Sequence, residues 1–177
     1  MPGYEHADIE QTAHCLGVRE TRRIQGLKTL DRQMVVDAVK QPDAIGHGFW
    51  LIDVHDPKGT GHTTWETQDE RDRPPAGDSY HIPFSMCLTD AVDNLAMAGR
   101  CASSTHEAHA SVRIQTHCMI MGQGVGTAAA LALDQNRLIR DVDMAGLQKT
   151  LIADGAYIQD IPQTGAAAPV RREAVCR

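Results

Sequence analysis

The segment of residues 94–133 combines residue types that could bind an electron-rich group. Gly99 ends an apolar run, and a glycine, having no Cβ, lets the backbone approach a ligand closely. A small, hydroxyl-rich loop of residues 102–105 precedes a helix that we expect from about His109 to Leu133, and its first turn would present free N–H groups and partial positive charge. Arg113, one turn into that helix, could add a full charge. These features favour an anion or an electron-rich carbonyl oxygen as the ligand.

Three glycines within five residues mark the same expected helix: Gly122, Gly124 and Gly126. Each would cost about 1 kcal/mol relative to alanine in an exposed helix. The group therefore predicts close packing against a sheet or another helix. A packing role alone stays open as the alternative, because strand–loop–helix units are common in α/β proteins.

Arginines and histidines elsewhere in the chain are candidates for substrate chemistry. Arg22, with Arg19 and Arg23, could clamp a substrate carboxylate, or the three could form a solvated face paired with Glu20. His55 follows a run that looks buried and lies between two aspartates, so it could carry a proton. A loop histidine without a role is the alternative.

The pair His106 and His109 does not predict a metal site. In the H-E-x-x-H motif the histidines are four residues apart, whereas here the second comes one residue early. Arg113 would lie between His109 and His117 on one helical face and would oppose a bound cation. We therefore expect no metal ligands, and a histidine-based metal-dependent hydrolase is kept as an alternative.

The composition narrows the class of protein. The 177 residues carry a formal net charge of -6 and only 4% aromatic residues, which argues against nucleic-acid binding. The N-terminus has no apolar core of a secretory signal, and the longest apolar run is shorter than the roughly 20 residues of a membrane span. Five widely separated cysteines predict free thiols in a reducing cytoplasm.

Local patterns then predict the elements that position these residues. Asp31 should cap a helix from Arg32 to Lys40, and Asp143 should begin an amphipathic helix that reaches Asp154. A long loop is expected over residues 57–78, and flexible ends over residues 1–15 and 159–177. Strands are expected over residues 16–30, 48–54, 80–84 and 94–100.

Three motifs in one order resemble a known family. They are LGVRETRRIQG at residues 16–26, YHIP at 80–83, and NLAMAGRCASSTHEAHASVR at 94–113 continuing to GQGVGTAAA at 122–130. Together they resemble the C-terminal part of FAD-dependent oxidoreductases related to the flavin subunit of heterodisulfide reductase and, more distantly, to fumarate reductase flavoproteins. The resemblance covers most of the chain, from about Cys15 to Ile158.

The resemblance implies an α/β fold: the last strand and helix of an incomplete Rossmann-like FAD-binding domain in residues 94–158, and part of a β-rich substrate domain in residues 16–93. It implies hydride transfer between a small-molecule substrate and FAD, with Arg113 and the helix start beside the pyrimidine edge of the flavin. The implied cofactor-binding residues are Gly99, Arg100, Ser111, Val112, Arg113 and Gly122. The catalytic candidates are Arg22, His55 and His106, the last because flavin relatives place such a histidine near the substrate.

One departure from the family pattern is informative. The family begins with G-x-G-x-x-G and an acidic residue about twenty positions later, and neither is present here. We therefore expect an inactive C-terminal fragment, or an accessory chain that completes a FAD domain on another polypeptide carrying the missing half. Some relatives hold iron–sulfur clusters, but the cysteines here lack the close spacing of cluster ligands.

Overall fold

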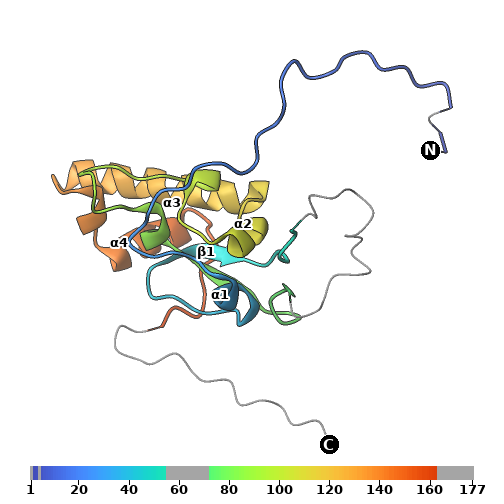
Figure 1. The fold of residues 1–177 in the computed structure, drawn as a ribbon. Coiled ribbons are helices and arrows are strands. Elements are labelled where there is room, and N and C mark those ends of the chain that lie inside the picture. Colours follow the sequence, from blue (N-terminus) through green and yellow to red (C-terminus); the bar gives the residue numbers. More distant parts are fainter. Residues whose placement is uncertain (1, 4, 55–71, 163–177) are drawn as a thin grey trace, which may run out of the picture.

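The computed structural model describes residues 2–3, 5–54 and 72–162. Most of the loop predicted over residues 57–78, most of the predicted tail and His55 lie outside the described residues. Figure 1 shows an N-terminal stretch that extends away from the folded part. The described elements, in chain order, are α1 (Arg32–Val36), β1 (Ala44–Gly48), β2 (Tyr80–Pro83), the 3-10 turns η2 (Phe84–Cys87) and η3 (Gly99–Cys101), α2 (His106–Val112), α3 (Gln115–Asp134), the 3-10 turn η4 (Ile139–Asp141) and α4 (Met144–Ala153).

The sheet of the described region is a single antiparallel pair, β1 with β2. All residues of both strands are buried, and α3 packs on β1 and beside α4 (Figure 1). The strand predicted from Tyr80 is confirmed. The strand predicted over residues 48–54 is wrong in position, because the ladder ends at Gly48 and the next two side chains, Phe49 and Trp50, are exposed. The mixture of helices and strands agrees with an α/β composition.

Two further predicted strands do not form. Residues 16–30 run extended and donate main-chain hydrogen bonds, such as Ile24 N to Cys101 O at 2.9 Å, but they contain only an isolated bridge of Leu30 to Ser104. Residues 94–100 contain one isolated bridge at Ala96 before turn η3 begins at Gly99. A strand needs a continuous ladder of hydrogen bonds to a neighbouring strand. In the described part of the chain these two segments make only separate hydrogen bonds and isolated bridges.

The helix predicted from His109 to Leu133 is two helices. Helix α2 begins after Thr105, whose side chain accepts a hydrogen bond from Ala108 N, and Ile114 then breaks the run with extended backbone at φ -65° and ψ 155°. The break frees carbonyl oxygens that would bond within a continuous helix. His117 Nδ1 donates to Ser111 O at 3.1 Å, while Arg100 Nε and Cys118 Sγ both donate to Arg113 O at 3.4 Å. Side-chain hydrogen bonds thus support the break.

Of the three glycines in α3, the middle one makes the close contact with the sheet. A Cβ at Gly124 would lie 2.7 Å from Cδ1 and 2.9 Å from Cβ of Ile45 in β1. Gly122 and Gly126 lie on the opposite, exposed side, where a Cβ would meet nothing within 4 Å. The predicted packing role therefore belongs to Gly124.

Helix caps and the core follow the sequence closely. Asp31 accepts a hydrogen bond from Met34 N and Asp143 accepts one from Gly146 N, as their positions predicted, although α1 ends at Val36. Leu147 and Leu151 of α4 are fully buried. Ile152 of the same helix is 47% exposed, whereas Gln148 is buried and its amide donates to Pro42 O and Ala44 O. No helix among the described residues is long and apolar enough to cross a membrane.

Candidate functional site

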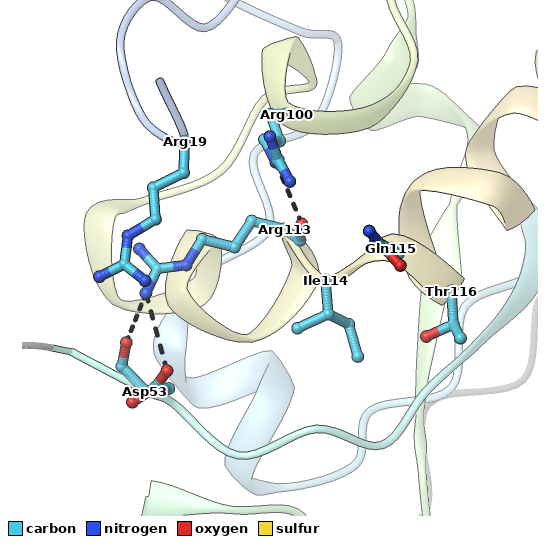
Figure 2. Close-up of a pocket in the computed structure, with 7 residues that line it drawn as sticks. All are labelled: Arg19, Asp53, Arg100, Arg113, Ile114, Gln115 and Thr116. Carbon is cyan, nitrogen blue, oxygen red and sulfur yellow. Dashed lines mark hydrogen bonds and ion pairs between the residues drawn. The ribbon is translucent and has the colours of Figure 1, made fainter. Parts of the chain in front are cut away.

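A pocket of about 350 Å³ opens where α2 ends and α3 begins. Arginines from three separate segments converge on it (Figure 2): Arg19 from the N-terminal segment, Arg100 from η3, and Arg113 from the end of α2. Asp53 lies beside Arg113, and the remaining lining residues are Ile114, the N-cap residue of α3, and Gln115 and Thr116 of its first turn. The pocket therefore combines three guanidinium groups with the positive end of a 20-residue helix.

The guanidinium of Arg113 is directed away from α3. Its Nη2 donates to Asp53 O at 2.7 Å and lies 3.9 Å from Asp53 Oδ2, while Nη1 lies 3.7 Å from Glu20 Oε2. Burial, with 8% of the residue exposed, and the neighbouring charge of Arg19 lower the pKa of Arg113. Arg113 is thus a fixed, partly compensated charge that shares one wall with Arg19.

Arg19 and Arg100 are differently placed. Among the described residues, no carboxylate lies within ion-pair distance of either guanidinium, and Arg100 holds only the carbonyl oxygen of Arg113. Helix α3 likewise begins without a side-chain cap, because Ile114 occupies the N-cap position. The pocket consequently has an excess of positive charge that the described side chains leave uncompensated.

A second pocket, of about 510 Å³, adjoins the first. It is lined by Gly99, Arg100, Gln115, Cys118 and Met119, so Arg100 and Gln115 border both pockets. Gly99 has a φ of +73°, a backbone conformation that favours glycine, and a Cβ there would lie 3.6 Å from Cys118 Cβ. The wall at Gly99 is therefore main chain, with a cationic side chain at one end.

Two predicted cofactor residues have buried side chains. Val112 is 1% exposed, and Ser111 Oγ donates to Trp50 O at 2.5 Å and lies 2.8 Å from the hydroxyl of Tyr80. Burial raises the pKa of Tyr80, so its hydroxyl stays protonated in this network. The side chains of Ser111 and Val112 therefore support the α2–α3 break from behind and do not face either pocket.

The predicted catalytic residues do not converge. Arg22 is exposed and lines neither pocket, and His55 lies outside the described residues. His106 is exposed at the start of α2, where its Nδ1 lies 2.7 Å from Glu20 Oε1. Burial acts to raise the pKa of Glu20, but hydrogen bonds with His106 and Arg23 dominate and lower it to about 2. Glu20 thereby links His106 to Arg113 at the edge of the first pocket.

The contacts of His109 join neighbouring segments. His109 Nδ1 lies 3.5 Å from Ser104 Oγ and its Nε2 lies 3.2 Å from Arg19 O, which fixes the main chain of the N-terminal segment. Among the described residues, no three His, Cys, Asp or Glu side chains gather where they could hold a metal ion.

Sequence reasoning missed several residues of the site. Gln115, Thr116, Cys118 and Met119 reach the pockets only because the helix breaks at Ile114, and no residue type signals that break. Arg19 was one of three equivalent arginines in the sequence, and its distance of 94 residues from Arg113 gave no sign that the two would meet.

The comparisons with known proteins add one finding. A family model described as FAD dependent oxidoreductase matches residues 1–151, most of the chain. No curated protein and no solved structure matches it significantly.

Proposed function

Because the chain belongs to the FAD-dependent oxidoreductase family, we propose that it binds the isoalloxazine end of FAD in the pocket of Gly99, Arg100, Gln115, Cys118 and Met119. The observation that carries this proposal is the uncompensated charge of Arg100 beside the uncapped start of α3. When bound, FAD supplies the electron and hydride transfer. The protein supplies orientation and charge, and the substrate is a small molecule.

The residues of this pocket fit one end of FAD. The main chain at Gly99 permits close approach of a flat ring, while Arg100 and the N–H groups of the first turn of α3 suit an electron-rich carbonyl edge. Nothing comparable among the described residues suits the ADP end, since the sequence has no G-x-G-x-x-G. The fit is therefore to the flavin ring alone.

Three of the other predicted cofactor residues support the pocket indirectly, and Gly122 does not. Arg113 accepts a hydrogen bond from Arg100 through its carbonyl oxygen, which orients the Arg100 side chain. Ser111 and Val112 fix the end of α2 by their burial, and Gly122 lies on the outer face of α3. We therefore assign the cationic role beside the flavin to Arg100.

His106 is the predicted catalytic residue whose position agrees best with the proposal. His106 lines neither pocket, but its Nδ1 lies 2.7 Å from Glu20 Oε1, and Glu20 Oε2 lies 3.7 Å from Arg113 of the first pocket. Arg22 and His55 remain predictions from the sequence. The proposal also keeps the suggested kinship with heterodisulfide reductase flavin subunits and a reducing, cytoplasmic location, based on the three motifs and the separated cysteines.

The direct test is the absorbance spectrum of the purified chain after addition of FAD and removal of the unbound cofactor. Retained, shifted flavin bands are the expected result. Free FAD with an unperturbed spectrum, in the presence of folded protein, would contradict binding by this chain alone.

Replacing Arg100 with glutamine should lower the reduction potential of the bound flavin. A positive charge near N1 favours the electron-rich reduced state, and its removal should shift the potential by about 30 mV, which for a two-electron couple corresponds to about 1.4 kcal/mol. The measurement is a spectrophotometric redox titration of the FAD-loaded protein. Arg137→Gln is the matched control, because Arg137 is exposed beyond the end of α3 and lines neither pocket. Equal reduction potentials in the wild-type protein and the Arg100 variant would contradict the proposed position of Arg100 beside the flavin.

A second function is favoured by the outer face of α3. Met119, which also borders the second pocket, and Leu133 are 69% and 82% exposed, and Gly122 and Gly126 between them leave the backbone of α3 accessible. Such a surface suits an accessory chain that completes a FAD domain on a polypeptide carrying the G-x-G-x-x-G half. In this case the chain alone stays colourless and retains FAD only when mixed with that polypeptide, which separates the two functions in the same spectroscopic test.

A further inference from the structure

Two arginines of the first pocket, Arg19 and Arg113, do not line the proposed flavin pocket. Arg19 and Arg113 lie beside each other on the wall away from α3 (Figure 2). Arg100 and Gln115 line both this pocket and the proposed flavin pocket. A ligand in the first pocket would therefore lie next to the flavin without occupying its place.

The charge balance of the pocket favours an anion. Its lining contains three arginines and one aspartate, and Asp53 faces Arg113. Glu20 also approaches Arg113, at 3.7 Å, but it lies outside the lining. Arg19 has no ion-pair partner among the described residues. An anion between Arg19 and Arg100 would thus meet two available guanidinium groups and the positive end of α3.

The size of the pocket limits that anion to a small molecule. A volume of about 350 Å³ admits a short organic acid. Guanidinium groups bind carboxylates through paired, charge-assisted hydrogen bonds. The phosphates of FAD share this anionic chemistry, so the two sources must be separated by experiment.

We propose that the pocket of Arg19, Arg100 and Arg113 binds the carboxylate group of the substrate and presents that substrate to the adjoining flavin pocket. Carboxylate binding is inferred from the residues of this pocket alone. That the bound carboxylate belongs to the substrate rests on the proposed function. Arg19 is the positioning residue that decides affinity, because its guanidinium is exposed and has no described carboxylate partner.

The test is an NMR titration of the full chain, without FAD and at low ionic strength, using succinate as the probe. Its uncharged diamide, succinamide, controls for size and hydrogen bonding. Succinate should shift the side-chain Nε–H signals of Arg19 and Arg100, and succinamide should not. Arg19→Gln should weaken succinate binding about tenfold or more, as expected for a lost charge-assisted hydrogen bond. Arg137→Gln, with the same loss of charge at an exposed position outside the pocket, should change the dissociation constant by less than about twofold.

The outcomes separate this proposal from the proposed function. No binding of succinate, or an equal loss in the Arg19 and Arg137 variants, would overturn the carboxylate site. A titration with FAD forms the second arm. If Arg19→Gln weakens FAD binding while succinate does not bind, the cofactor's phosphates occupy the pocket and the proposal is wrong. If succinate binds at Arg19 and the chain does not retain FAD, the carboxylate site stands and the flavin function of the isolated chain fails.

Discussion

Replacing Gly48 with alanine is expected to lower the free energy of unfolding by about 3 kcal/mol, the upper end of the range for overpacking a buried site. Gly48 is the last residue of β1 and pairs directly with Tyr80 of β2. A Cβ at this position would overlap the Tyr80 ring. The measurement is urea unfolding at neutral pH.

The Tyr80 ring cannot move aside without further loss. It is fully buried, its hydroxyl lies 2.8 Å from Ser111 Oγ, and its ring meets the edge of His117 at a centroid distance of 6.0 Å. Shifting the ring would strand a buried hydroxyl and disturb the Ser111 contact that supports the end of α2. The variant should therefore also weaken any ligand binding at the pocket.

Gly126→Ala is the matched control for this substitution. A Cβ there meets nothing within 4 Å, and alanine is favoured over glycine in a helix by about 1 kcal/mol. The control should be slightly more stable than wild type. Equal stabilities of the Gly48 and Gly126 variants would show that Tyr80 does not hold the position described.

Acidification should destabilise the protein between pH 6.5 and pH 4. Burial lowers the pKa of His117 to about 4, and burial together with the charges of His81 and Lys40 lowers that of His47 to about 4. These side chains stay neutral in the folded protein while the unfolded chain takes up protons near pH 6.5. Stability is therefore fully present above pH 6.5 and falls as the pH decreases toward 4, by about 1.4 kcal/mol per pH unit for each such histidine.

The contacts of these histidines explain why protonation is unfavourable. His117 donates from Nδ1 to Ser111 O and accepts from Phe49 N at Nε2, so a second proton would break the latter bond. His47 accepts from Gln159 N at Nε2 and stacks edge-on against His81 at 4.6 Å. The charge of Lys40 opposes protonation of both His47 and His81. Asp160 favours protonation of these two rings, but its effect is weaker than that of burial.

Urea unfolding at several pH values from 7.5 to 4.5 measures this slope. Protonation of Glu20 does not contribute to the slope above pH 4.5. The pKa of this carboxyl is lowered from 4.5 to about 2, so its protonation affects stability only below pH 4.5. His117→Gln should flatten the slope, since glutamine retains a donor and an acceptor without titrating. His14→Gln, at an exposed position, should leave the slope unchanged. A constant free energy of unfolding across the window would contradict the burial of neutral histidines.

The sequence by itself determined features that depend on near neighbours. Asp31 and Asp143 cap helices because a side-chain oxygen reaches an N–H only three residues away. Tyr80 begins a strand because its segment is rich in strand-forming side chains. The family motifs also followed from the sequence, and three of the residues that they singled out, Gly99, Arg100 and Arg113, line the two pockets.

The tertiary structure alone decided how that region is arranged. The break at Ile114 depends on His117, Arg100 and Cys118 taking up freed carbonyl oxygens, and residues that bond in space leave no local pattern. The same holds for Arg19, which lines the first pocket with Arg113 although the two are 94 residues apart in the sequence. Gly124 differs from its two neighbours only because Ile45 faces it. Local propensity acts over about one helical turn, whereas the pockets are formed by packing between segments far apart in sequence. Local patterns therefore could not predict which segments meet at the pockets.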